Sequence, residues 1–292
     1  MRLVLTPIRA DFRGHGQTDA GASMADWEVT DELWARIRPL LPVVQRRRRH
    51  PGRRRLDDRA CLNGVLFVLV TGMRWDRLPV QLGYGSGVTC WRRLRAWTQA
   101  GVWDRLHELL LAELHGLGRI DWSRAAADAS HIRAKRGDDA IGPSPVDRRR
   151  PGSKHHALVD GSSLPLAVAL TGGNRHDSTR LIELVDAVPA VRGRRGRPRR
   201  RPDHLAADRA YDAKQLRHQL RARGIRPLLA RRGVGHGSGL GRGRWVVERF
   251  FGWLHNSYRR LATRWEYRAD IHLGFMKLAC CLICWRRRAL PC

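Results

Sequence analysis

Three acidic residues in the second half of the sequence have the setting of a shared catalytic site. Asp128 follows the apolar residues 125–127, Asp208 ends a second short apolar run, and Glu248 lies in a segment with helical periodicity. Two acids at strand ends and one on a helix can meet at one end of a sheet, where their oxygens suit a hard divalent cation. Two ions about 4 Å apart would activate an attacking hydroxyl and stabilise a leaving oxygen in phosphodiester chemistry.

The charge of the chain points to the partner of such a site. The 292 residues include 56 Lys and Arg against 27 Asp and Glu, a formal net charge of +29. This imbalance predicts an acidic partner, with nucleic acid first and an anionic membrane surface second. A hydrophobic content of 42% is enough to bury a real core, so the chain is not a disordered basic tail.

The cysteines and the apolar runs indicate an intracellular protein. Cys281 and Cys284 form one Cys-x-x-Cys pair, but it lies inside the apolar run 273–285 and has no second pair, so buried structural thiols are expected. That run is shorter than the roughly 20 apolar residues of a membrane span and contains Lys277, which predicts a core helix. Residues 1–17 lack a signal-peptide pattern. We expect a cytoplasmic, nucleoid-associated protein with no membrane partner.

The N-terminal third is predicted to be helical. Residues 1–23 are Gly-rich without periodicity, which predicts an unstructured extension with Met24 as the functional start. Thr30 is placed to cap a helix that ends at Pro42, and the apolar residues 62–70 predict a second helix. The helical domain is expected to span residues 24–118.

A third helix of this domain has the pattern of a DNA-contacting element. Val88, Trp91, Leu94 and Trp97 recur at three-residue steps and predict one buried side. Arginines lie between them, as on the recognition helix of a helix-turn-helix motif. A solvated arginine face on an ordinary helix is the alternative; the basic run 46–55 and the total charge favour DNA contact. The arginines are Arg92, Arg93 and Arg95.

From residue 119 the pattern changes to that of a mixed α/β domain extending to residue 292. Asp212 and Gln215 are expected to cap a helix that runs to Arg223, and the Gly-rich residues 233–243 are expected to form a flexible insertion. Strands are predicted at 125–132, 156–159, 165–171, 205–208 and 226–229, and a helix at 178–188.

The helix that begins near Arg244 is predicted to hold Glu248 outward while packing its other side. Its apolar stripe is formed by Val247, Phe250, Phe251, Leu254 and Leu261. A second face carries Arg244, Glu248, Gly252, His255 and Arg259, so arginines one turn or more from the acid can grip DNA phosphates.

Together these motifs resemble the DDE transposases of bacterial insertion sequences, most closely the insertion-sequence-five group. The resemblance covers nearly everything after Met24. In the first half, its motifs are Thr30-Asp-Glu-Leu-Trp, Arg59-Ala-Cys-Leu-Asn-Gly and Gly72-Met-Arg-Trp-Asp-Arg-Leu-Pro. In the second half, they are Asp128-Ala-Ser-His, Lys154-His-His-Ala-Leu-Val-Asp, Asn174-Arg-His-Asp, Ala207-Asp208-Arg-Ala-Tyr-Asp, Val247-Glu248-Arg-Phe-Phe and Tyr258-Arg-Arg-Leu-Ala-Thr-Arg-Trp-Glu.

The resemblance implies a ribonuclease-H-like mixed-sheet catalytic domain behind an all-α, helix-turn-helix-like domain. Asp128, Asp208 and Glu248 would be the catalytic, metal-binding triad for two Mg²⁺ or Mn²⁺ ions. Of the family's Tyr-Arg-Glu-Lys signature, Arg244 is present, whereas Gly241 and His255 stand at the Tyr and Lys positions. His255 is either a phosphate contact or a simple surface histidine.

Further DNA contacts are expected in these motifs. They are Lys154, Arg244, His255 and Arg259. His176 and Asp177 lie in a family motif but are placed outside the metal shell, with Asp177 as a cap of the following helix.

The expected function is that of a transposase. It would bind the terminal inverted repeats of its element as a homo-oligomer, cleave the DNA strands at the ends and join them to target DNA. A ribonuclease-H-like nuclease without end specificity, and an inactive relic that only binds DNA, are the alternatives. The basic helical domain argues against the nuclease, and the presence of all three acids argues against the relic.

Overall fold

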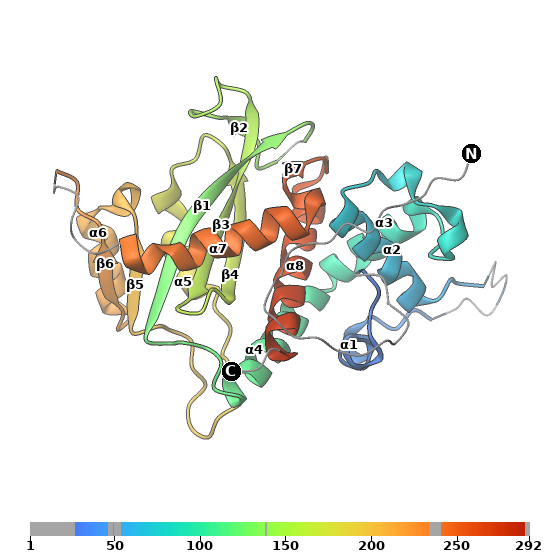
Figure 1. Cartoon of the computed structure of the whole chain (residues 1–292), viewed down its shortest axis with the longest axis horizontal. Helices are drawn as coiled ribbons and strands as arrows, with labels where there is room; N and C mark the ends of the chain where they lie inside the picture. The colour runs from blue at the N-terminus through green and yellow to red at the C-terminus, as the bar shows by residue number, and fades with distance from the viewer. Residues whose placement is uncertain (1–26, 46–48, 50–53, 138, 234–240, 290–292) are drawn as a thin grey trace, which may run out of the picture.

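The protein consists of a group of helices and a mixed sheet, with one long helix between them (Figure 1). The computed structural model describes residues 27–45, 49, 54–137, 139–233 and 241–289. The predicted extension, residues 1–23, therefore lies outside the described residues, as does most of the Gly-rich stretch 233–243.

The helices come first in the chain. They are α1 (Asp31–Ile37), α2 (Asp58–Thr71), α3 (Gly87–Gln99) and α4 (Val102–Gly116), with short 3₁₀ turns at Arg38–Leu40, Trp75–Arg77 and Val80–Leu82. The Thr30 side chain accepts the Leu33 N–H, which confirms the predicted cap of α1. Helix α4 was not among the predicted helices, although its leucines repeat with helical spacing and several are buried.

The buried face of α3 differs from the predicted one. Leu94 and Trp97 are fully buried as expected, but Cys90 completes the face, while Val88 is 57% exposed and Trp91 lies half-buried. The prediction of Val88 was wrong because a strict three-residue step drifts off a helix of 3.6 residues per turn, whereas Trp91 packs against the core from the margin of this face. The spacing 90, 94 and 97 follows the turn.

The sheet mixes antiparallel and parallel strands. Strands β4 (Pro165–Gly172), β3 (Pro151–Asp160) and β1 (Arg124–Ala134) pair antiparallel, and β5 (His204–Ala207) and β6 (Arg226–Leu229) continue in parallel from β1. The five predicted strands are all present. Two short strands, β2 (Gly142–Pro143) and β7 (Thr263–Arg264), add to β3 and β1.

Helices of the second half flank the sheet. They are α5 (Leu181–Asp186), α6 (Lys214–Ala222), α7 (Gly241–Ser257) and α8 (Ala269–Ala289), with 3₁₀ turns at Asp177–Arg180, Arg209–Tyr211 and Arg259–Leu261. The predicted capping pair of α6 is wrong: the cap position is Ala213, and Asp212 instead accepts from Arg217 and the Arg232 N–H, at 2.6 and 2.8 Å.

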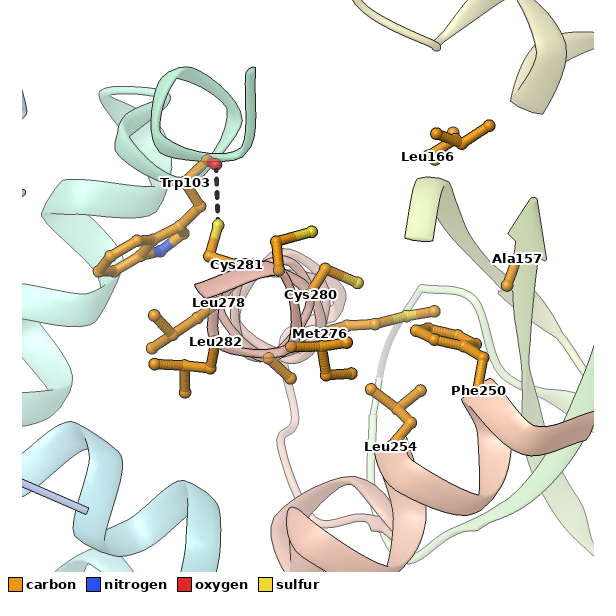
Figure 2. Close-up of a cluster of buried hydrophobic side chains, with 14 of the residues drawn as sticks. Trp103, Ala157, Leu166, Phe250, Leu254, Met276, Leu278, Cys280, Cys281 and Leu282 are labelled. Carbon is orange, nitrogen blue, oxygen red and sulfur yellow. Dashed lines mark hydrogen bonds between the residues drawn. The ribbon is translucent and has the colours of Figure 1, made fainter. Parts of the chain in front are cut away.

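Helix α8 forms the centre of the hydrophobic core, in contact with α4 and α3 on one side and with β4 and α7 on the other. Figure 2 shows its side chains between Trp103 of α4 and Phe250 and Leu254 of α7. The thiol of Cys281 lies 3.4 Å from the Trp103 carbonyl oxygen. Cys280, Cys281 and Cys284 are all buried and free, which confirms structural thiols. In the parts of the chain described above, the helices are all too short or too polar to cross a membrane.

This architecture confirms the predicted fold class. A ribonuclease-H-like mixed sheet, with an acid on its central strand β1, follows a helical N-terminal region.

Candidate active site

Parallel pairing of β1 with β5 brings two of the three predicted acids together. Ala126 of β1 is in register with Ala206 of β5. Asp128 and Asp208 each lie two residues beyond this pair, so both occur at the same edge of the sheet.

Both aspartates are anchored to the backbone through one carboxylate oxygen. Oδ1 of Asp128 accepts the Ala129 N–H at 2.8 Å, and Oδ1 of Asp208 accepts the Ala210 N–H at 2.8 Å, capping the turn that follows β5. Burial raises the pKa of Asp128, and the charge of Asp208 adds to the increase, while the Ala129 N–H and Arg244 oppose it. The charge of Asp208 thus acts on Asp128, as expected of two acids at the same end of the sheet.

Glu248 is not assembled with this pair. It lies on α7, which packs against β1, β3 and β5, but its side chain is exposed to solvent. Among the described residues, no three His, Cys, Asp or Glu side chains converge closely enough to hold a metal ion. The donor set fits a hard cation in its chemistry, since all three predicted ligands are carboxylates, and two of them share one edge.

A protein cation already lies at the site. The guanidinium of Arg244, from the first turns of α7, approaches Oδ2 of Asp128 at 3.4 Å. Its Nε is buried and has no hydrogen-bond partner. Arg244 thus supplies a positive charge beside Asp128 through one long contact.

Tyr211, in the turn that Asp208 caps, was not among the predicted site residues. Its side chain is fully buried and its hydroxyl has no hydrogen-bond partner. Burial raises its pKa well above 10, and the charges of Asp128, Asp177 and Asp208 raise it further. An unpaired buried polar group costs about 1–3 kcal/mol. The signal for Tyr211 is its place three residues after Asp208, within a motif that was quoted only for its aspartate.

Lys154 and Asp177 form a half-buried ion pair beside the aspartates. Lys154 Nζ lies 2.7 Å from Asp177 Oδ1 and 2.9 Å from the Arg175 carbonyl oxygen. The predicted cap role of Asp177 is wrong, because the His176 side chain accepts the Ser178 N–H and so caps the turn. Lys154 is therefore held by protein partners rather than extended toward solvent.

His255 is not a simple surface histidine. Its ring is half-buried, stacks on Phe251 at a centroid distance of 5.9 Å, and places Nε2 3.2 Å from Nδ1 of the buried His155. His155 Nε2 lies 2.8 Å from Nε2 of His272 in α8. A row of three rings thus runs from α7 through β3 to α8.

The predicted DNA contacts of α3 differ in exposure. Arg92 and Arg95 are exposed, and the Arg95 guanidinium lies over the Trp91 ring at 5.6 Å. Arg93 is largely buried, with its Nε 2.9 Å from Asp58 Oδ1. Arg259 is exposed and packs on the α2 cap residue Gly72. Its predicted place on the face of Glu248 was wrong, because α7 ends at Ser257 and Arg259 lies in the 3₁₀ turn that follows.

The motif at residues 258–266 forms a buried polar clamp. Arg260 donates two bonds to Glu266 Oε1, at 2.6 and 2.8 Å, and a third to the Met73 carbonyl oxygen at 3.1 Å. Arg264 is fully buried and donates to the carbonyl oxygens of residues 139, 140, 266 and 267. Through Arg260, this segment after α7 is hydrogen-bonded to the backbone that follows α2 in the first half of the chain.

The mixed sheet behind a helical region, together with two family models, defines an enzyme of the DDE class, which cleaves and transfers nucleic-acid strands. Residues 123–284, more than half of the chain, match the family described as "Transposase DDE domain", and residues 29–107 match "Putative transposase of IS4/5 family". The chain belongs to the DDE transposases of the IS4/IS5 insertion sequences.

Individual relatives agree with this family. The chain is 56% identical over 155 residues to a putative transposase for insertion sequence element IS402 of Burkholderia cepacia, covering 52% of this chain and 73% of that protein. It is 33% identical over 148 residues to a putative transposase for IS6501 of Brucella ovis, covering 46% and 98%.

Solved structures give weaker likenesses. The Mos1 strand transfer complex matches with a TM-score of 0.32 at 12% identity, covering 84% of this chain and 82% of that chain. A simian T-cell lymphotropic virus intasome in complex with PP2A regulatory subunit B56 gamma matches with a TM-score of 0.38 at 18% identity, covering 59% and 56%.

Proposed function

We propose that this transposase binds the terminal inverted repeats of its element, cleaves the DNA strands at those ends and joins them to target DNA. The observation that carries the proposal is the pairing of Asp128 and Asp208 at adjacent parallel strand ends, with Arg244 as their counter-charge. Asp128, Asp208 and Glu248 are proposed as the ligands of two Mg²⁺ or Mn²⁺ ions, with Glu248 completing the set. When bound, such ions activate the attacking hydroxyl and stabilise the leaving oxygen.

The protein's own residues position the reacting strands. The backbone N–H groups of Ala129 and Ala210 fix the two aspartates before DNA arrives. Arg244, Lys154, His255 and Arg259 are proposed to face DNA near the scissile phosphate. Arg244, Lys154 and Arg259 carry the positive charge of a phosphate-binding surface, whereas the neutral imidazole of His255 would contact DNA as a hydrogen-bonding group.

The helical region is proposed as the DNA-binding domain, residues 24–118, and residues 119–292 as the catalytic domain. Arg92 and Arg95 on the exposed side of α3 are its proposed contacts with the repeats. Two DNA ends have to be held together for joining, so we propose a homo-oligomer on the ends. The enzyme would act on chromosomal DNA in the cytoplasm.

The test is strand cleavage on a plasmid that carries the DNA flanking this reading frame. Wild-type protein, Asp208→Asn and Asp203→Asn are incubated with and without Mg²⁺ or Mn²⁺, and breaks are mapped by primer extension. Asp203 precedes β5 at the opposite end of the strand and is exposed, so Asp203→Asn is a matched control. We expect metal-dependent breaks at a pair of inverted repeats with wild type and control, and a loss of at least about 100-fold with Asp208→Asn.

The other outcomes separate the alternatives. Unchanged cleavage by Asp208→Asn would refute the proposed site. Cutting of branched junctions without end specificity would favour a nuclease. Specific retention of the flanking DNA without cleavage under any divalent ion would favour an inactive DNA-binding relic.

A further inference from the structure

Two exposed aromatic side chains lie two residues apart, just after the short strand β7. Trp265 is 46% and Tyr267 60% exposed, and one other aromatic side chain in the described ranges is exposed, Trp245 at 44%. Arg264 and Glu266, which alternate with the two rings, are buried. This alternation is that of a strand continuing past β7, so both rings lie on one face, about 7 Å apart along the backbone. Single exposed apolar residues are ordinary, whereas neighbouring ones point to an interaction site.

The backbone that carries the two rings is held from below by Arg264. Its guanidinium donates to the carbonyl oxygens of residues 266 and 267, at 3.2 and 3.0 Å, and of residues 139 and 140, at 2.7 and 3.0 Å. The Lys135 N–H, at the end of β1, donates to the Arg264 carbonyl oxygen at 2.9 Å. The rings are therefore presented by a segment that is already ordered, which lowers the entropic cost of binding a ligand.

Two cations border the rings. Lys135 Nζ lies 5.7 Å from the centroid of the Trp265 ring, and Arg136, the next residue, is exposed as Lys135 is. Within the part of the chain that the structure describes, neither cation forms an ion pair. Rings with cations beside them suit a nucleic-acid strand, because the cations bind phosphates while the rings stack on bases. The net charge of +29 repels a second copy of this chain and attracts DNA, so DNA is the favoured occupant.

The rings lie between the two aspartates and the helical region. Arg264 of β7 is in register with Ala134 of β1, six residues beyond Asp128 on the same strand, which is about 20 Å. On the other side, Glu266 Oε2 lies 3.5 Å from Nε1 of Trp75, between α2 and α3. Figure 1 shows β7 between the sheet and these helices. DNA held by both regions at once would pass this surface.

We propose that Trp265 and Tyr267 form a stacking surface for unpaired DNA bases, with Lys135 and Arg136 binding the phosphates of the same strand. The inference rests on the proposed function in taking DNA as the ligand. Bases inside a duplex are stacked on one another, so the ligand is DNA with unpaired nucleotides, as arises where a cleaved strand leaves its complement. The distance from Asp128 corresponds to about six nucleotides, so a strand cut at the active site reaches the stacking surface.

The test compares the affinity of the full chain for two DNA molecules without divalent ions, so that no strand is cleaved. One is a fully paired duplex, and the other is the same duplex with a short unpaired segment in one strand. Wild type should bind the second more tightly. Trp265→Ala and Tyr267→Ala should each lose about 5-fold or more of the affinity for unpaired DNA. Their affinity for the paired duplex should change little, which also shows that the variants are folded.

Substitutions at one position separate stacking from other contacts. Trp265→Phe keeps an aromatic face and should retain most of the preference for unpaired DNA. Trp265→Leu keeps apolar surface without a ring and should lose the preference as Trp265→Ala does. Lys135→Gln should weaken binding of both DNA molecules and lower the slope of log affinity against log salt by about 1.

Trp245 provides a matched control. It is 44% exposed, and the Arg249 guanidinium already packs on its ring at 4.4 Å from the centroid. Val247, two residues further on, is buried, so Trp245 has no second exposed ring beside it. Trp245→Ala therefore removes the same side chain at the same exposure. It should leave the preference for unpaired DNA unchanged.

Several results would overturn the inference. They are equal affinity of wild type for the two DNA molecules, an unchanged preference in Trp265→Ala, a retained preference in Trp265→Leu, and an equal loss in Trp265→Ala and Trp245→Ala. Self-association of wild type that Trp265→Ala abolishes would assign the rings to a second copy of the chain instead. The proposed function fails separately, if Asp208→Asn cleaves DNA as wild type does while the preference for unpaired DNA still depends on Trp265.

Discussion

At the scale of single residues, the buried histidine row has a defined direction. A neutral imidazole carries one N–H, and His272 Nδ1 is buried without a partner. An orphaned acceptor is tolerated better than an orphaned donor, so His272 Nε2–H donates to His155, and His155 Nδ1–H donates to His255. Burial lowers the pKa of His255 to about 4 and of His272 to about 3, and the pKa of His155 lies well below its usual range. The row is therefore neutral in the folded protein.

This neutrality predicts an acid-sensitive stability. A histidine whose pKa is lower in the folded than in the unfolded protein takes up a proton on unfolding, so its stabilising effect is complete above about pH 6.5 and is lost as pH falls toward 4. His255→Gln keeps an acceptor for His155 and removes one titrating group. Between pH 7 and pH 5 the free energy of unfolding should fall about 1–2 kcal/mol further in wild type than in this variant, as measured by urea denaturation. If the free energy of unfolding of wild type and of His255→Gln changed with pH in parallel, the three histidines would not be neutral in the folded protein.

At the scale of elements, α3 separates arginines that the sequence pattern groups together. The helix turns Arg92 and Arg95 outward and Arg93 toward Asp58, at the start of α2. Only the first two are available to a DNA backbone. Arg93 joins two helices instead.

The separation predicts different effects of three substitutions. Arg92→Gln and Arg95→Gln should each weaken binding to DNA of any sequence and reduce the slope of log affinity against log salt by about 1. Arg93→Gln should lower stability with a smaller change in that slope. Arg221→Gln is the control, because it removes the same single positive charge from an exposed position on α6. Binding isotherms at several salt concentrations measure the slope of log affinity against log salt for each variant. Equal slopes for Arg92→Gln and Arg221→Gln would contradict a DNA-facing α3.

Elements defined by local periodicity could be predicted from the sequence, whereas contacts between distant segments could not. The α1 cap and β6 follow from residues next to one another, and both agree with the structure. The register that brings Asp128 and Asp208 to the same end of the sheet joins β1 to β5, across about 80 residues of sequence. The surface-histidine alternative for His255 was wrong for the same reason, because its partner His155 and the next ring, His272, belong to other elements.

At the scale of the whole molecule, the buried pair Arg260–Glu266 connects the two halves of the chain. Both side chains are about 5% exposed, and Arg260 also reaches the carbonyl oxygens of Gly72 and Met73 after α2. Gly72 has a φ of 74°, and a side chain there would press on Arg259. The polar contacts at this junction are therefore shielded from water.

Removing one partner should leave an uncompensated buried charge. Glu266→Ala should lower the free energy of unfolding by about 3–5 kcal/mol. Asp76→Ala breaks the exposed pair with Arg74 and should change it by less than about 1 kcal/mol. Chemical denaturation of both variants measures the difference, and similar small losses would show that the junction contributes little.

The central position of α8 also has a consequence for the order in which the protein can be made. A ribosome delivers the helices α1–α4 and the strands of the sheet long before residues 269–289, yet both surround this helix (Figure 1). Domains usually fold as they emerge, N-terminal part first. Here the apolar surface that α8 covers stays exposed on the earlier segments until translation is nearly complete. A transposase whose reading frame is interrupted late would therefore lose the core of both halves and not only its last helix.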